Sequence, residues 1–167
     1  MTTHDDQPQW KRLIKSRIFK IMFSQTSEYA IRALTILARH SLDQFVLVGT
    51  LAETASLPHH YLSKILQNLV RMQILESRKG SRGGFRLARN PNEITLHEIV
   101  NAIENLSQTR RCLLGQIECS DERACPLHDF WVTQTDRYMD TLNNTSLADL
   151  VRFEDNLKTN DPAKAAS

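Results

Sequence analysis

Long apolar runs are missing from the sequence, which holds no stretch near the roughly 20 residues that a membrane-spanning helix needs. The N-terminal residues carry several basic side chains but neither a continuous apolar stretch nor a small-residue cleavage site, so they do not resemble a secretory signal. Internal repeats and low-complexity tracts are absent as well. We therefore expect a cytoplasmic protein that has no membrane partner.

Cysteine is also scarce. The 167 residues include only Cys112, Cys119 and Cys125, and all three lie in one charged segment. An odd number of cysteines in a reducing compartment argues against a disulfide framework. A metal or iron–sulfur site and a reactive thiol are the two interpretations that the rest of the sequence must decide between.

The remaining composition is that of an ordinary globular protein, with 41% apolar and 24% charged residues. The length suggests one domain, or a small domain with an appended element. Residues 1–90 hold fourteen Lys and Arg against six Asp and Glu, a net charge of +8, whereas residues 91–167 hold seven against thirteen, a net charge of −6. A basic half joined to an acidic half is expected where one half binds a polyanion, although scattered surface charge is the simpler reading.

Helical spacing of apolar residues predicts three helices in the basic half. The first begins near Ser27 as N-cap and ends near His40; the second has Thr50 as N-cap and Glu53 in a capping box; the third follows Pro58. The third helix is apolar on one side and polar on the other, which is typical of the recognition helix of a helix-turn-helix. Its candidate DNA-binding residues are His59, His60, Ser63, Lys64, Gln67 and Arg71.

A strand, a basic glycine-containing tip and a returning strand follow in "ILESRKGSRGGFRLAR". A hairpin directly after a recognition helix is a wing, and its candidate DNA-binding residues are Arg78, Lys79 and Arg82. An ordinary solvated surface is the alternative. In the DNA-binding interpretation, the wing contacts phosphates and supplies affinity, while the helix reads the bases of a double-stranded operator.

The acidic half predicts a helix over "TLHEIVNAIEN" and a long helix that is opened by Pro126 and carries an apolar stripe. The stripe comprises Leu127, Trp131, Tyr138 and Leu142. Such a stripe favours a homodimer, because helix-turn-helix readers match their two-fold symmetry to paired half-sites; packing within the chain is the alternative. The expected fold is mainly α, a winged helix-turn-helix with a β-hairpin wing and a long C-terminal dimerisation helix. The expected divisions are a basic extension (1–21), the winged domain (22–90), the cysteine-loop and dimerisation region (91–155) and a disordered tail (156–167).

The cysteine segment has the spacing Cys112-x6-Cys119-x5-Cys125-x2-His128. It lacks the Cys-x2–4-Cys pair that is usual in structural zinc sites. Three thiolates with one further ligand suit an iron–sulfur cluster. The alternatives are a zinc or cluster-free thiol site and, remotely, an enzyme with Cys125 as nucleophile and His128 as base, for which no orienting residue is evident.

Five stretches together resemble the BadM/Rrf-type family of winged-helix transcription regulators. They are "SEYAIRAL" (27–34), "YLSKIL" (61–66), "GSRGGFRLAR" (80–89), the three-cysteine segment with "CPLH" (125–128), and "LNNTSLADLV" (142–151). The resemblance spans residues 22–151, most of the chain.

This resemblance implies a dimeric DNA-binding regulator, of repressor type and not an enzyme, that senses redox state, nitric oxide or iron–sulfur status. It implies a [2Fe–2S] or [4Fe–4S] cluster held by Cys112, Cys119 and Cys125. The fourth ligand varies in the family, and the matching positions here are His128 and, as a ligand supplied by the partner subunit, Glu28.

Overall fold

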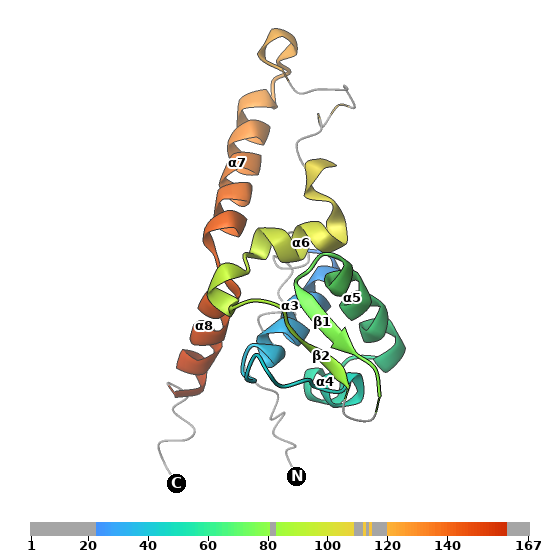
Figure 1. The fold of residues 1–167 in the computed structure, drawn as a ribbon. Helices are drawn as coiled ribbons and strands as arrows, with labels where there is room; N and C mark the ends of the chain where they lie inside the picture. Colours follow the sequence, from blue (N-terminus) through green and yellow to red (C-terminus); the bar gives the residue numbers. More distant parts are fainter. Residues whose placement is uncertain (1–22, 81–82, 109–111, 113, 115–119, 160–167) are drawn as a thin grey trace, which may run out of the picture.

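The computed structural model describes residues 23–80, 83–108, 112, 114 and 120–159. Helices dominate it, as expected, and two strands form the only sheet among these residues. The elements, labelled as in Figure 1, are α3 (Gln25–Leu37), α4 (Val48–Ala55), α5 (His59–Arg71), β1 (Leu75–Arg78), β2 (Gly84–Leu87), η1 (Pro91–Glu93), α6 (Leu96–Glu104), η2 (Leu106–Gln108), η3 (Asp121–Arg123), α7 (His128–Asn144) and α8 (Leu147–Thr159).

The core lies where α3, α4, α5 and α6 meet. Helix α3 contacts each of the other three and also α8. Leu34, Leu51 and Leu66 come from three of these helices, and each is fully buried. Burial of a leucine side chain contributes about 1.5–3 kcal/mol. The apolar spacing in the sequence therefore identified the buried sides of α3 and α5.

Two predicted helix starts are wrong. Helix α3 is capped by Ser24, whose Oγ accepts a hydrogen bond from the N–H of Ser27 at 3.2 Å, so Ser27 lies inside the first turn. Helix α4 begins after an extended Leu47 and has no side-chain cap, which leaves Thr50 inside the helix. Helix α4 starts at Val48, earlier than the predicted Thr50, because Val46 pairs with Phe85 of β2 and the chain turns into the helix directly after this pair.

The predicted wing is confirmed as an antiparallel hairpin in which Leu75 pairs with Leu87 and Arg78 pairs with Gly84. The α3–α4 loop joins it, because Val46 and Phe85 exchange two backbone hydrogen bonds, each 2.9 Å long. A Cβ on Gly84 would lie 2.2 Å from the Val46 carbonyl oxygen, and the φ of Gly84 is +128°. Only glycine allows this close approach.

Helices α6 and α8 begin side by side. Leu96 N–H donates to the carbonyl of Thr145, and Leu147 N–H donates to the carbonyl of Ile94. A capping box of Thr95 and Glu98 starts α6. Burial is the largest single influence on the Glu98 carboxyl and by itself would raise the pKa. The hydrogen bonds from Thr95 and the charge of the Arg89 guanidinium together outweigh burial, so the net effect is a lowered pKa of Glu98.

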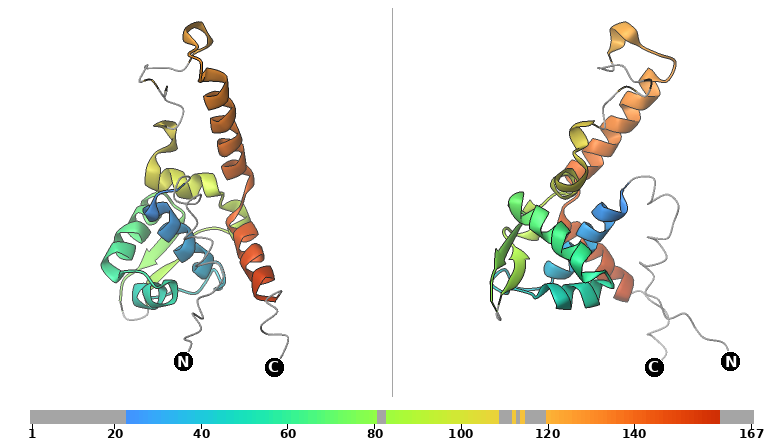
Figure 2. Two further views of the ribbon diagram at one scale, coloured as in Figure 1. Left: turned by 180° about the vertical axis from the view of Figure 1, so that it is seen from behind. Right: turned by 90° about the vertical axis from the view of Figure 1, so that its right-hand side faces the viewer.

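Helix α7 projects from the body formed by the other helices (Figures 1 and 2). Only its C-terminal part packs on the core, where Leu142 is 1% exposed. The helix starts at His128 rather than at Pro126, because Leu127 has a non-helical φ of −101° and ψ of 0°. Helix α8 continues to Thr159, past the expected start of the tail at residue 156. Residues 1–22 and 160–167 lie outside the described part of the chain.

Within the described ranges, no helix has both the length and the apolar character that crossing a membrane requires.

Candidate nucleic-acid interface and metal centre

The polar side of α5 is accessible, as a recognition helix requires. His59, His60, Lys64, Gln67 and Arg71 are exposed, and Ser63 is partly buried, its hydroxyl donating to the His59 carbonyl at 2.9 Å. The opposite side of the helix buries Leu62, Ile65, Leu66 and Leu69. Its apolar residues fix α5 on the core, so the six predicted DNA-binding residues of this helix lie together on or beside one accessible surface.

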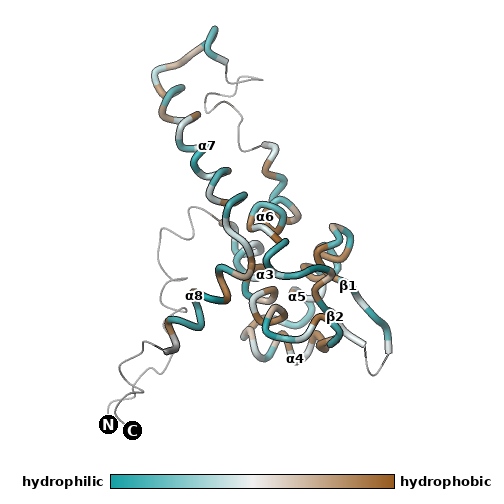
Figure 3. Tube along the Cα trace, turned by 60° about the vertical axis from the view of Figure 1, so that its left-hand side comes forward, coloured by the Kyte–Doolittle hydropathy of each residue, from teal (hydrophilic) through white to brown (hydrophobic). Residues whose placement is uncertain are grey.

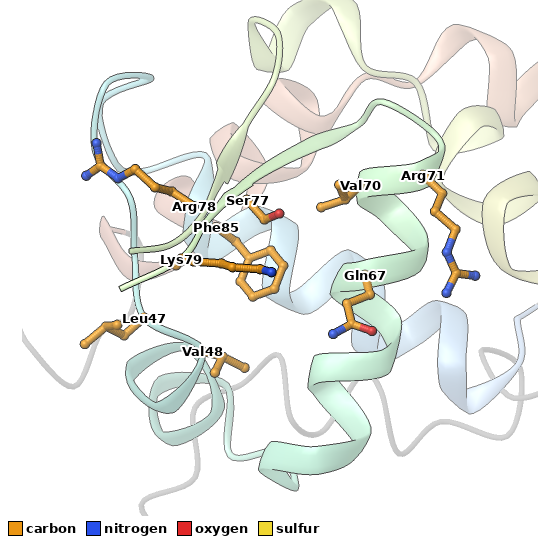
Figure 4. A pocket seen from close by; sticks show the side chains of 10 residues that line it. Leu47, Val48, Gln67, Val70, Arg71, Ser77, Arg78, Lys79 and Phe85 are labelled. Atoms are coloured by element: carbon orange, nitrogen blue, oxygen red, sulfur yellow. The ribbon is translucent and has the colours of Figure 1, made fainter. Parts of the chain in front are cut away.

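A hollow of about 520 Å³ separates α5 from the wing. In Figure 4, Lys79 points from the wing into this hollow, Gln67 points into it from α5, and the ring of Phe85 lies at its back. Its lining residues are Leu47, Val48, Gln67, Val70, Arg71, Ser77, Arg78, Lys79, Gly84 and Phe85. The hollow is therefore mainly apolar inside and cationic at its margins, which suits a phosphate strand with its sugars.

Phe45 is a contact residue of the wing that the sequence interpretation missed. The Cζ atom of Arg78 lies 4.2 Å from the centroid of the Phe45 ring, and that of Arg86 lies 4.6 Å from it. Arg86 also donates two hydrogen bonds, of 2.7 and 2.9 Å, to a carboxylate oxygen of Glu76 on the paired strand. Arg82, the third predicted wing residue, lies outside the described residues.

A second hollow, of about 360 Å³, lies on the other side of α5. It is bordered by Thr26, Tyr61, Lys64, Ile65, Gln67, Asn68, Arg71 and Ile103. The hydroxyls of Thr26 and Tyr61 form a hydrogen bond of 2.6 Å that connects the first turn of α3 to α5. The two hollows flank the recognition helix and share Gln67 and Arg71.

Cys125 precedes the start of α7, at the end of the helix that projects from the body (Figure 1). Cys112 is 8% exposed and Cys125 is partly buried. The N–H of His128 donates to the Cys125 carbonyl at 2.9 Å, and His128 Nε2 lies 2.9 Å from Asp121 Oδ1. The His128 side chain is only 8% exposed, whereas Asp121 is fully exposed.

Cys119 lies outside the described residues, so the complete predicted ligand set is not described. Among the residues that are described, no group of three or more His, Cys, Asp or Glu side chains is arranged to hold a metal ion. The described donors nevertheless have suitable chemistry. Thiolates are the usual protein ligands of iron–sulfur clusters, and a carboxylate that accepts a hydrogen bond from one ring nitrogen commonly orients a ligating histidine.

Glu28 lies far from Cys125 and His128 within one chain. It belongs to the first turn of α3 in the body, while the other two residues lie at the outer end of α7 (Figures 1 and 2). Its Oε1 accepts a hydrogen bond from Arg32 Nη2 at 2.7 Å, and its side chain is 10% exposed. Glu28 could therefore reach a cluster only in a second chain.

Two hydrogen bonds connect α6 to α5 and to the start of α3. Asn68 of α5 donates through Nδ2 to the Ala102 carbonyl at 2.6 Å, and the N–H of Ser24 donates to Glu104 Oε1 at 2.8 Å. Burial first, and then the nearby Glu104 carboxylate, raises the pKa of Tyr138 on α7 to about 12. The end of α6 thus contacts α3 and α5 immediately before the chain enters the cysteine segment.

A model of the Rrf2 family, described as an iron-dependent transcriptional regulator, matches residues 23–153. The chain belongs to the Rrf2 family. The resemblance expected from the sequence is thereby confirmed, and this Rrf2 protein is a transcription regulator rather than an enzyme. An HTH-type transcriptional regulator of Aquifex aeolicus is 31% identical over 137 residues, which cover 81% of this chain and 94% of that protein. The HTH-type transcriptional regulator IscR of Pectobacterium atrosepticum is 29% identical over 133 residues, 80% of each chain.

Solved structures agree on the winged-helix fold of this Rrf2 protein. CymR, the global cysteine regulator of B. subtilis, is 22% identical and superposes with a TM-score of 0.65 over 78% of this chain and 96% of CymR. IscR of T. potens is 23% identical and has a TM-score of 0.62 over 86% of this chain and 91% of that chain.

Proposed function

We propose that this Rrf2 protein is a homodimeric, cytoplasmic repressor that binds a double-stranded DNA operator and responds to the state of an iron–sulfur cluster. The observation that carries the proposal is the position of α6, which is hydrogen-bonded to the recognition helix at Ala102 and leads at its C-terminal end into the segment with Cys112, Cys119 and Cys125. One short helix therefore joins the DNA-reading surface to the candidate cluster ligands.

DNA contact is supported by the accessible polar surface of α5 and the cationic wing beside it. We expect Gln67 and Arg71 of α5 to read base edges in a major groove and Lys79, which lines the hollow beside them, to contact a neighbouring phosphate strand. His59, His60, Ser63 and Lys64 complete the α5 contact surface, and Arg78 and Arg82 extend it on the wing.

Cluster binding is assigned to Cys112, Cys119, Cys125 and His128, with Glu28 of a second subunit as the alternative fourth ligand. Asp121 supports the choice of His128: if Nε2 donates its hydrogen to this carboxylate, the ring's lone pair is at Nδ1. Glu28, by contrast, is already ion-paired with Arg32. A [2Fe–2S] or [4Fe–4S] cluster, when bound, supplies a redox-active and nitric-oxide-reactive group.

Dimerisation is supported by the exposed apolar residues near the outer end of α7. Leu127 and Phe130 are 49% and 62% exposed and lie three residues apart at the start of the helix. Hydrophobic residues alternate with hydrophilic ones along the projecting helix in Figure 3. Two α7 helices packed on each other would cover these side chains and fix the distance between two recognition helices.

Regulation then acts through α6. A cluster-bound cysteine segment restrains the C-terminal end of α6, and the hydrogen bond from Asn68 to Ala102 transmits this restraint to α5. Without this restraint, α5 can adopt more positions relative to the α5 of the second subunit. The two states of the segment therefore favour different spacings of the recognition helices.

The cluster is tested by purifying the full chain without oxygen and measuring iron, acid-labile sulfide, zinc and visible absorbance. We expect iron and sulfide in equal amounts, with charge-transfer absorbance that is lost in Cys125→Ala. The Asp121→Asn variant keeps the cluster but shifts its absorbance, since Asp121 only orients His128. Stoichiometric zinc, or no metal after reconstitution, contradicts the cluster and supports a zinc or cluster-free thiol sensor on the same DNA-binding fold.

A further inference from the structure

The outer side of the wing carries an arginine that an aromatic residue of another element holds in place. Glu76 and Arg86 are paired in the hairpin, and alternate residues of a strand point to the same side, so Arg78 lies on the side of Glu76 and Arg86. Lys79 follows in the chain and points into the hollow beside α5, whereas Arg78, although it borders the same hollow, directs its guanidinium away from α5 (Figure 4). The two neighbouring cations of the wing are therefore directed to opposite sides of it.

Phe45 lies on this outer side and contacts two arginines. Its ring stacks with Arg78 at 4.2 Å and with Arg86 at 4.6 Å, each measured from Cζ to the ring centroid. A guanidinium over an aromatic ring is attracted by the ring quadrupole and loses rotational freedom. Arg86 is in turn ion-paired with Glu76 at 2.7 Å. Of the two arginines that stack on Phe45, Arg86 is thus ion-paired within the sheet, and Arg78 is directed to the edge of the wing.

The loop that carries Phe45 is fixed to the wing itself. Val46, the next residue, exchanges two backbone hydrogen bonds of 2.9 Å with Phe85, and Gly84 leaves room for the Val46 carbonyl. These contacts therefore fix the position of Phe45 relative to β1 and β2. A side chain held in this way has less entropy to lose on binding than an exposed arginine on an unsupported strand.

We propose that Phe45 is a positioning residue for DNA binding, which holds the Arg78 guanidinium against the phosphate strand on the far side of the minor groove from α5. The proposal rests on the proposed function, because it assumes that α5 enters a major groove and the wing follows the adjacent minor groove. That groove is only about 6 Å wide, so a wing over it has a phosphate strand on each side. Lys79 contacts the near strand and Arg78 the far one.

The test is a double-mutant cycle on a duplex that the wild-type full-length protein selects from a random library. Phe45→Leu weakens binding about two- to fivefold, the usual strength of an accessible cation–π contact, and Phe45→Tyr restores it. Arg78→Gln lowers the slope of log K against log salt by about one. In the Arg78→Gln background, Phe45→Leu has no further effect. An equal loss in both backgrounds means that Phe45 only supports the fold, and it overturns the proposal.

Two further measurements keep the test decisive if Phe45→Leu unfolds. Pentafluorophenylalanine at position 45 keeps the ring's shape but removes its attraction for a cation, and it must weaken binding as Phe45→Leu does. Methylphosphonates on the far strand must abolish the effect of Arg78→Gln and leave that of Lys79→Gln. The reverse pattern overturns the strand assignment. Failure of the wild-type protein to select any duplex is a different result, since it contradicts the proposed function itself.

Discussion

Among single residues, two contacts join the α3–α4 loop to the wing. Gly84 contacts the backbone of Val46, and the Phe45 ring contacts two arginines of the wing. Gly84 combines a φ of +128° with a carbonyl of Val46 so near that any side chain would overlap it. The sequence shows that residue 84 is a glycine but not why a glycine is required there, because the backbone that approaches it belongs to the distant α3–α4 loop. Phe45 was missed for the same cause: its partners Arg78 and Arg86 are distant in the chain.

Asp149 gives a prediction about pH. Hydrogen bonds from Ser146, first from its side chain and then from its backbone, together with Arg152, lower the pKa of this carboxyl to about 2. A lowered pKa in the folded state stabilises the protein above the unfolded value of 3.8, and this contribution is lost as the pH falls toward 2. Asp149→Asn therefore lowers the Tm at neutral pH, and its difference from wild type shrinks between about pH 4 and pH 2.

Thermal unfolding of the full chain without added iron, followed by circular dichroism from pH 7 to pH 2, measures this difference. Asp140→Asn is the control, since Asp140 is an exposed carboxylate of α7. A Tm difference for Asp149→Asn that is the same at pH 7 and at pH 2 contradicts a stabilising role of the Asp149 charge.

At the scale of elements, α6 connects sensing to DNA reading. Asn68→Ala removes the 2.6 Å hydrogen bond from α5 to the Ala102 carbonyl. We expect a loss of about 1 kcal/mol in the free energy of unfolding. The ratio of operator affinities between cluster-loaded and cluster-free protein should also move toward one, because the restraint no longer reaches α5.

Fluorescence anisotropy of both forms measures that ratio, and Asn143→Ala, at an exposed position of α7, is the control. If Asn68→Ala changes both affinities by the same factor, Asn68 stabilises the fold without transmitting the state of the cysteine segment.

The sequence predicted correctly the elements that are specified by their own local residue pattern. The apolar spacing of α5 and the basic hairpin were read correctly, since both patterns follow from which side of an element is buried. The start of α4 was wrong because Val46 pairs with Phe85, a contact that no local pattern records. Asp121 beside His128 could have been suspected from its place in the cysteine segment, yet only the fold brings the two side chains to 2.9 Å.

At the scale of the whole molecule, the projecting α7 predicts an obligate pair of chains. Phe130 is 62% exposed near its outer end, so Phe130→Glu would bury a charge in each half of a two-fold interface. An interface would bury the exposed 62% of each Phe130, which contributes about 1–2 kcal/mol per copy, so loss of both copies weakens the dimer by about 2–4 kcal/mol. Sedimentation equilibrium measures the effect.

Phe153→Glu is the matched control, because Phe153 is 54% exposed on α8, which packs against the body. We expect Phe153→Glu to leave the dimer intact. A wild-type protein that sediments as a monomer, or a dimer that survives Phe130→Glu, contradicts the role given to α7.

The proposed function requires that the cluster controls how tightly this Rrf2 protein binds DNA. The most direct test titrates the selected duplex with one anaerobic preparation, before and after its cluster is removed by a chelator and an oxidant. We expect the two operator affinities to differ by about tenfold or more, within the usual range of allosteric coupling. Equal affinities for the two forms, at the same salt concentration and the same dimer concentration, would contradict it.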